Sequence, residues 1–243
     1  QKLTEKEIKR IGLTPWTPNI IPRTLLLMGG AIAALDHVMK CGGIAGNMAG
    51  GTHHAHYNFG SGYCIFNDLA VCSRLALSKY QLTRIAIIDF DVHQGDGTAT
   101  ILQNVDEVLT ISMHCQQNFP FRKSESDFDL VLPANAGDEE VLAVVARALD
   151  ITREFDPELI LFQAGVDGLA TDALGKLNMS RLGMSKRNEM VFELVQELSI
   201  PAVVFMGGGY SKPISHTIDA FSDLFLSAYR ANNQILSRIN LAT

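Results

Sequence analysis

The sequence predicts an α/β fold in three layers, with helices covering both faces of a mainly parallel central sheet. Three observations predict it. Short apolar runs alternate with longer amphipathic or apolar segments along most of the chain. The clearest short run, residues 84–89 (RIAIID), is apolar almost throughout, as in a strand covered on both faces by helices. The 243 residues, of which 47% are hydrophobic, suffice for one substantial core, so we expect a single domain over residues 1–243.

The expected elements follow in chain order. The first two dozen residues are polar and contain Pro15, Pro18 and Pro22, so we expect a surface segment there. Residues 24–40 are apolar and are followed by glycines, which is typical of a buried helix with a glycine cap. A loop rich in glycine and histidine comes next. The other expected helices are 66–78, 138–154, 180–198 and 213–231, and the expected strands are 84–89, 107–113, 158–164 and 201–206.

The composition excludes several classes of protein. The 20 basic and 26 acidic residues give a net charge of −6, and no block of Lys and Arg is present. A surface that tracks nucleic-acid phosphates is therefore not expected, whereas cationic substrates suit the overall charge. The longest apolar run, residues 25–35, is too short to cross a bilayer, and no secretory signal is visible. We expect neither a nucleic acid nor a membrane as a partner.

The four cysteines indicate a reducing compartment. Cys41, Cys64, Cys72 and Cys115 are widely spaced and form no CxxC pair. Reduced, mostly buried thiols are expected in an α/β chain of this size, which favours the cytoplasm.

Candidate functional residues follow the expected strands. Ligands of open parallel sheets bind beyond the carboxyl ends of the strands. Four polar or glycine-rich segments occupy such positions: 89–93 (DFDVH), 112–114 (SMH), 165–167 (GVD) and 207–210 (GGGY).

The first of these segments suggests a metal site. Residues two apart at the end of a strand point to the same side, so Asp89, Asp91 and His93 are expected to project together. Carboxylates and imidazoles are good ligands for zinc, and Asp167, after another strand, is the natural third ligand. Three protein ligands leave a position open for water and substrate. Taken alone, the D-x-H pattern more often caps the next helix than binds a metal.

A pair of adjacent histidines, His53 and His54, lies in the glycine-flanked segment 50–55 (GGTHHA). A hydrolase that activates water with a metal needs a base to accept the proton of the attacking water. Each histidine would gain basicity from a carboxylate partner, and Asp89 and Asp96 are available on the same side of the sheet.

Tyr210 follows three glycines at a strand end, where the phenol could donate to a developing oxyanion. In isolation the same segment would be interpreted as a turn with a surface tyrosine. No catalytic role is assigned to the remaining histidines: His37 and His216 in expected helices, His56 near the loop rim and His114 after an expected strand.

Five segments, in this order, resemble the motifs of the histone deacetylase superfamily: 50–55 (GGTHHA), 62–67 (GYCIFN), 89–97 (DFDVHQGDG), 165–167 (GVD) and 207–210 (GGGY). The stretch 165–178 is most similar to the class IV branch and its bacterial relatives. The resemblance extends from Thr24 to the C-terminus. It implies an arginase/deacetylase fold and a role for each matching position.

For the metal centre, the resemblance implies that Asp91, His93 and Asp167 bind one Zn²⁺, or Fe²⁺ as in some members. Tyr210 would polarise the substrate carbonyl together with the ion.

For proton transfer, it implies that His54, paired with Asp96, is the main general base. His53, paired with Asp89, would give electrostatic support and handle the second proton transfer. Ser112 and Asp89 match a buried monovalent-cation (K⁺) site of the family.

For the substrate channel, it implies a lining of Gly62, Tyr63 and Phe119. Thr52 and Tyr63 replace residues that are often aromatic or Phe in other branches, so channel selectivity is not carried over. The family normally has further N-terminal sequence with an early strand, and this part of the domain is expected to be missing here.

The function implied is a zinc-dependent amide hydrolase that removes an acetyl or longer acyl group from an acylated lysine or a related amine. An acetylpolyamine or a small metabolite remains an alternative substrate. A two-metal ureohydrolase of the arginase kind would need a D-x-D pair, but Gly165 stands two residues before Asp167. A non-catalytic sensor of acyl ligands is the third alternative, and the oligomeric state is left open.

Overall fold

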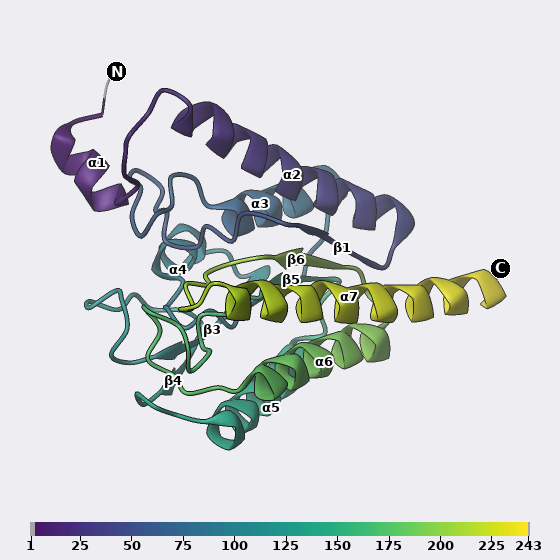
Figure 1. Cartoon of the computed structure of the whole chain (residues 1–243). Coiled ribbons are helices and arrows are strands. Elements are labelled where there is room, and N and C mark those ends of the chain that lie inside the picture. The colour runs from purple at the N-terminus through teal and green to yellow at the C-terminus, as the bar shows by residue number, and fades with distance from the viewer. Residues whose placement is uncertain (1–2, 243) are drawn as a thin grey trace.

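The computed structural model describes residues 3–242, and side chains as far as Ser237. Its centre is a six-stranded sheet in the order β1-β6-β5-β2-β3-β4, in which all neighbouring strands are parallel (Figure 1). The strands are β1 (Ile44–Asn47), β2 (Ile85–Asp89), β3 (Val108–Cys115), β4 (Phe128–Leu132), β5 (Leu159–Gln163) and β6 (Ala202–Phe205). The helices are α1 (Glu5–Ile11), α2 (Ile20–Cys41), α3 (Asp68–Tyr80), α4 (Asp96–Leu102), α5 (Asp138–Phe155), α6 (Arg181–Leu198) and α7 (Ser215–Ala242).

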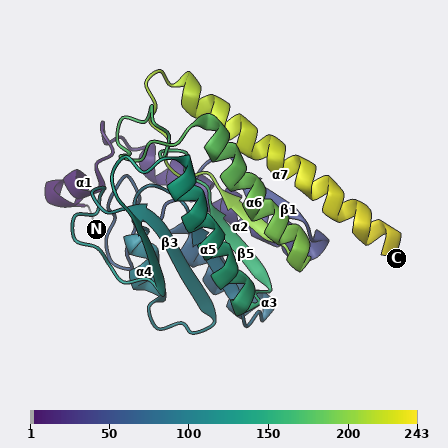
Figure 2. The ribbon, with the colours of Figure 1, turned by 90° about the horizontal axis from the view of Figure 1, so that it is seen from below.

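Helices cover the sheet on both faces, which confirms the predicted three-layer α/β/α fold. Figure 1 shows α2 and α3 on one face and α5, α6 and α7 on the other; in Figure 2 the latter three lie side by side. Every residue of β2, β3, β5 and β6 is buried, as expected for apolar strands between two helical layers. Two hydrophobic clusters, one on each side of the sheet, form the core.

The register of the sheet brings the ends of the central strands level with one another. Asp89, the last residue of β2, is paired with Ser112 of β3 and with Gln163, the last residue of β5. Gln163 is in turn paired with Phe205, the last residue of β6. The loops that follow these strands therefore begin at one edge of the sheet. They gather at the left of Figure 1, where α7 begins.

Four elements were not predicted. α1 lies in the expected surface segment, although Thr4 and Glu7 form the capping box that its sequence carries. β1 and β4 are edge strands of four and five residues, and each has residues that are not buried, so neither is a continuous apolar run. α4 spans seven residues and opens with the segment Asp96–Gly97, which resembles a turn.

One expected strand also ends later than predicted. The predicted strand ends at residue 113, whereas β3 ends at Cys115, so the whole segment 112–114 lies within the strand and Ser112 and His114 are both buried. The apolar residues Met113 and Cys115, between and after them, are also buried, so the strand continues through polar positions.

By length and composition alone, α2 is long and apolar enough to cross a membrane. The sequence analysis did not predict this, because it considered only the shorter apolar run 25–35. In the fold it contacts β1, β6 and α3, as a helix that covers one face of the sheet.

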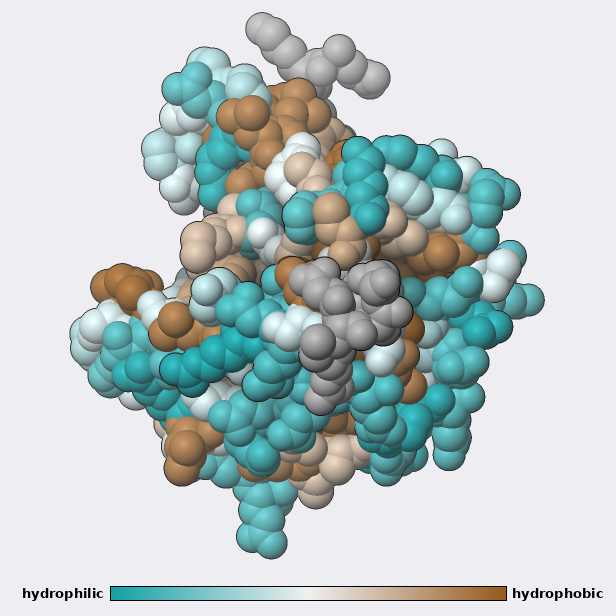
Figure 3. Space-filling model, turned by 90° about the vertical axis from the view of Figure 1, so that its right-hand side faces the viewer, coloured by the Kyte–Doolittle hydropathy of each residue, from teal (hydrophilic) through white to brown (hydrophobic). Residues whose placement is uncertain are grey.

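Of the four free cysteines only Cys41, at the end of this helix, is exposed. Viewed from the end of α7, the surface is mainly hydrophilic with separate hydrophobic patches (Figure 3).

Candidate metal centre and active site

Three loops at the carboxyl ends of the central strands surround a cavity of about 860 Å³. The loop after β2 contributes Asp91 and His93, and the loop after β5 contributes Asp167. The loop after β6 contributes Tyr210, and the segment between β1 and α3 contributes the two adjacent histidines. The structure thus brings together the metal-ligand, histidine and tyrosine candidates that the sequence analysis singled out.

Asp91, His93 and Asp167 offer one donor atom each, and these atoms lie within 4.8 Å of one another. The Nδ1 of His93 lies 3.0 Å from Oδ1 of Asp91 and 3.1 Å from Oδ2 of Asp167. Burial and the nearby charge of Asp91 raise the pKa of Asp167 to about 7. Two buried carboxylates that repel each other beside an imidazole nitrogen fit a divalent cation, which would remove this repulsion.

Backbone groups hold the other carboxylate oxygens. The amide of Val92 donates to Oδ1 of Asp167 over 2.9 Å, and the amide of Gly208 donates to Oδ2 of Asp91 over the same distance. A side chain at Gly208 would collide with the carboxylate of Asp167. The glycine after β6 is therefore needed for the close approach of this loop to the ligands.

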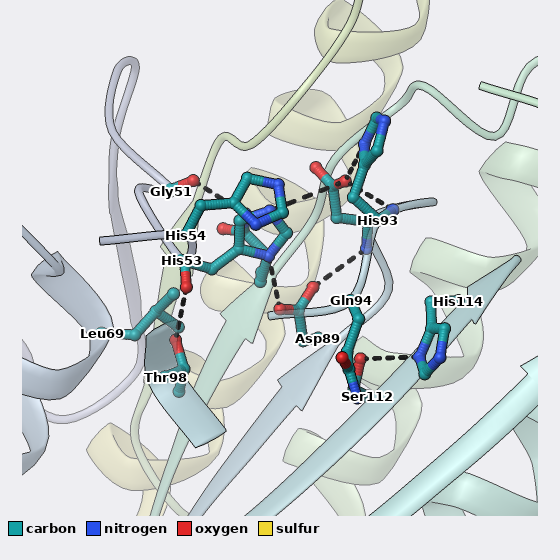
Figure 4. Close-up of polar contacts among 12 residues, drawn as sticks. Gly51, His53, His54, Leu69, Asp89, His93, Gln94, Thr98, Ser112 and His114 are labelled. Carbon is teal, nitrogen blue, oxygen red and sulfur yellow. Dashed lines mark hydrogen bonds and ion pairs between the residues drawn. The ribbon is translucent and has the colours of Figure 1, made fainter. Parts of the chain in front are cut away.

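Each of the two adjacent histidines donates from Nδ1 to its own buried aspartate (Figure 4 labels both histidines and Asp89). His53 lies 2.7 Å from Asp89, and His54 lies 2.6 Å from Asp96. A carboxylate can only accept, so these contacts place a proton on each Nδ1 and leave Nε2 for the cavity. The ring of His54 also faces Phe119, with the ring centroids 4.9 Å apart.

The two histidines differ in their electrostatic surroundings. Burial alone would lower the pKa of His53, but the charges of Asp89 and Asp91 outweigh it and raise the pKa to about 9. Burial and the neighbouring His53 lower the pKa of His54 to about 4. At neutral pH the Nε2 of His54 is therefore free to accept a proton, as a general base requires.

The carboxylate of Asp96 is shared with a histidine to which no role was assigned. The Nε2 of His56 lies 3.2 Å from the second oxygen of Asp96, and the Nδ1 of His56 lies 2.8 Å from the hydroxyl oxygen of Thr100. Both oxygens of Asp96 are thus held, which fixes the orientation of His54. The GGTHHA motif gives no indication of this contact, because His56 lies two residues beyond His54.

Tyr210 lies at the rim of the cavity, 38% exposed, with its ring 6.1 Å from that of Tyr63. Burial of its hydroxyl and the charges of Asp91 and Asp167 raise the pKa of Tyr210, so the phenol keeps its proton. Asp172 fixes the backbone here: its carboxylate accepts from the amide of Tyr210 over 2.6 Å and from the amides of Leu174 and Gly175 over 2.8 Å. The sequence analysis did not identify Asp172.

The three expected channel residues, Gly62, Tyr63 and Phe119, all line the cavity. Gly62 has a φ of +52°, and a side chain there would collide with the ring of His54. The glycine is therefore required both by the left-handed backbone and by the contact with the histidine.

Residues 2–222 match the model of the histone deacetylase domain. The chain belongs to the histone deacetylase family. This confirms the expected family and, at the level of the family, the expected deacetylase class of hydrolase.

Two relatives and one solved structure illustrate the breadth of the histone deacetylase family around this chain. It is 43% identical to an uncharacterized protein of Picosynechococcus sp. over 93% of this chain and 75% of the relative. It is 32% identical to histone deacetylase 2 of Arabidopsis thaliana, over 88% of this chain and 58% of that protein. The crystal structure of acetylpolyamine aminohydrolase from Burkholderia pseudomallei shares the fold, with a TM-score of 0.74 and 21% identity over 86% of this chain and 63% of that one.

The K⁺ site implied by the resemblance stays a prediction for this histone deacetylase family member. Asp89 and Ser112 are neighbours in the sheet and line a small cavity under the active site. The hydroxyl of Ser112 contacts Nδ1 of His114 over 3.1 Å, as Figure 4 shows.

A fully buried cation near the candidate metal ligands is Arg187 of α6, which the sequence analysis missed. Its guanidinium is fully covered and donates to the carbonyls of Gly165 (2.6 Å), Ala164 (3.1 Å) and Phe90 (3.2 Å). These carbonyls belong to the two loops that carry Asp91 and Asp167. Burial lowers the pKa of Arg187 to about 10, so it is still charged at neutral pH. Arg187 thus joins the two loops beneath the ligands.

The Arg187→Met variant is expected to lower the free energy of unfolding by about 3–5 kcal/mol. The substitution keeps the apolar stem but leaves three buried carbonyl groups without their donor. Urea unfolding of both proteins in the presence of chelator measures this effect without any contribution from a bound ion. A loss below about 1 kcal/mol would show that Arg187 does not hold the two loops together.

Proposed function

We propose that this chain is a zinc-dependent deacylase that removes an acetyl or longer acyl group from an acylated lysine or a related amine. The observation that carries the proposal is the position of the three-donor cluster beside two histidine–aspartate pairs in one cavity. Membership of the histone deacetylase family supports amide deacetylation in general. The free, mostly buried thiols support a proposed location in the cytoplasm.

Asp91, His93 and Asp167 would hold the ion. Two carboxylates and one imidazole are a donor set that Zn²⁺ accepts readily, and Fe²⁺ is the alternative. When bound, the ion would supply Lewis-acid polarisation of the substrate carbonyl and would lower the pKa of a coordinated water. Among residues 3–242 one group of this kind is found, which fits one ion better than the two of a ureohydrolase.

The histidines would move the protons. His54, whose low pKa leaves Nε2 unprotonated at pH 7, would accept the proton of the water that attacks the amide carbon. Asp96 keeps the Nδ1 proton of His54 in place during this step. His53, whose Nδ1 proton is held by Asp89, would stabilise negative charge and supply a proton to the leaving amine.

Tyr210 would stabilise the negative charge on the carbonyl oxygen of the tetrahedral intermediate. Its raised pKa makes the phenol a hydrogen-bond donor over the whole physiological range of pH. The acyl-amine chain would reach these groups between Tyr63 and Phe119, which line the same cavity.

The test is release of product by the zinc-loaded protein, offered acetyl- and longer-acyl-lysine peptides, acetylated polyamines and small acetylated amines. We expect turnover that a chelator abolishes and that added Zn²⁺ restores. Binding of an acyl-lysine peptide without any turnover would favour the sensor alternative. Two tightly bound ions per chain, with release of urea from a guanidino substrate, would favour the ureohydrolase.

Asp172 gives a prediction about positioning. In Asp172→Asn one acceptor oxygen becomes an amide donor, so the amides of Tyr210, Leu174 and Gly175 can no longer all be satisfied. We expect kcat to fall about ten- to a hundredfold, with little change in KM or in zinc content, because the phenol is displaced.

The double variant Asp172→Asn/Tyr210→Phe separates positioning from general damage to the fold. If Asp172 acts through the phenol, its substitution has little further effect once the hydroxyl is gone. Losses that multiply in the double variant would contradict this positioning role.

A further inference from the structure

The charged residues that line the cavity are unevenly distributed. Among the described lining residues, the carboxylates are Asp91 and Asp167, both of them candidate metal ligands. The other charged side chains, histidines aside, are cationic: Arg10, Arg23 and Lys176. The part of the cavity beyond the metal ligands is therefore positively charged, although the whole chain carries a net charge of −6.

The placement of Arg10 follows from the charge pattern of α1. This helix has Glu5 and Glu7 in its first turn and Lys9 and Arg10 in its last turn. The last turn is the part of the helix that reaches the cavity, and Arg10 is its first lining residue. Arg10 lies over the ring of Phe59, 4.2 Å from its centroid, and its Nε donates to a backbone carbonyl. Its guanidinium makes no ion pair within the described part of the chain.

Lys176 lies on another side of the cavity, in the loop that follows Asp167. Its Nζ donates to the carbonyl of Gln117 over 2.9 Å, and it too forms no ion pair among residues 3–237. Because the carbonyl oxygen of Gln117 carries no formal charge, this hydrogen bond does not neutralise the positive charge of Lys176. Lys176 and Arg10 thus present fixed positive charge to whatever part of a substrate remains outside the channel.

The rest of the rim is apolar or neutral. Phe121, Tyr63 and Leu174 line the cavity and are 88%, 48% and 41% exposed. Such surfaces can cover the neutral backbone of a peptide. They offer no acceptor of full negative charge to an ammonium group.

We infer that the substrate is an acylated lysine in an acidic peptide sequence, and that acylated polyamines are disfavoured. This inference rests on the proposed function. A polyamine would place one or two ammonium groups beside Arg10, Arg23 and Lys176, where the described lining offers no carboxylate besides the candidate metal ligands. Carboxylates flanking an acyl-lysine would meet these cations directly. Within a Debye length of about 8 Å, such local charges outweigh the net charge of the chain.

The experiment uses the zinc-loaded full chain and three acetyl-lysine peptides that differ only in the two flanking residues, which are Glu, Gln or Lys. N-acetylspermidine is the fourth substrate. We expect kcat/KM to fall from the Glu to the Gln to the Lys peptide by about three- to tenfold per step, with acetylspermidine poorest. Raising the salt concentration from about 0.05 to about 0.5 M should compress these ratios.

Reversing the charge of one lining residue tests whether the preference for acidic peptides arises at the cavity. Lys176→Glu should lower the Glu/Lys peptide ratio by about tenfold, whereas Lys186→Glu, an exposed lysine of α6 that does not line the cavity, should leave the ratio unchanged. Equal rates on the three peptides, or acetylspermidine as the best substrate, would overturn the inference while leaving the deacylase intact. An absence of turnover on all four substrates, with zinc bound, would instead count against the proposed function itself.

Discussion

Asp167→Ala is expected to leave the chain without tightly bound metal and, with it, without measurable turnover. The substitution removes one of three donors whose ligand atoms lie within 4.8 Å of one another. It also leaves the amide of Val92 without its acceptor. Loss of one of three protein ligands lowers the affinity for zinc by several orders of magnitude, since two ligands cannot retain the ion against a chelator.

Metal content after dialysis against a weak chelator measures this directly. The unsubstituted chain should retain about one zinc per chain, and the variant less than about a tenth. Asp167→Asn keeps an oxygen for Val92 and separates loss of the ligand charge from loss of that hydrogen bond. Asp106→Ala, at an exposed aspartate away from the cavity, is the matched control and should retain its metal. Full zinc occupancy in Asp167→Ala would exclude this residue as a ligand.

Tyr210→Phe is expected to lower kcat by about a hundred- to a thousandfold, because it removes one donor to the oxyanion. The phenyl ring should fill nearly the same space at the rim, and the backbone contact of Tyr210 with Asp172 is unaffected. Zinc content and KM should therefore change little, so the loss lies in the transition state.

Steady-state kinetics on an acetyl-lysine peptide, with zinc content determined on the same sample, measure the change. Tyr229→Phe removes the hydroxyl of an exposed tyrosine of α7 and serves as the control. If Tyr210→Phe turned over at the unsubstituted rate, the phenol would have no part in stabilising the oxyanion.

The sequence predicted the layers and the edge of the sheet that carries the site because these depend on local patterns. The run 85–88 (IAII) is apolar throughout, and β2 (Ile85–Asp89) forms there with every residue buried. The polar residues after it had to lie at the carboxyl end of the sheet. β1 and β4 were missed because they are short edge strands with partly exposed residues, in which hydrophobic periodicity is weak.

The supporting residues of the site were not predictable in the same way. Arg187 bonds a carbonyl 97 positions away, and Asp172 bonds an amide 38 positions away. Each is a polar residue in a helix or loop that would ordinarily be solvated, so only the tertiary fold shows its contacts. The pairing of each histidine with its aspartate was implied by the family resemblance, since spacings of 36 and 42 residues carry no local signal.

The position of β6 in the sheet has a consequence for how the chain folds. This strand, residues 202–205, lies between β1 and β5, both of which come earlier in the sequence. Until it is inserted, β1 has no strand to pair with, and the glycine loop that holds Asp91 has not been placed. The continuous sheet and the ligand geometry therefore depend on contacts between distant parts of the chain, which folding proteins form slowly. In a nascent chain that ends before residue 202, the edge of β5 that β6 will cover is open and β1 is unpaired. Such exposed strand edges favour aggregation.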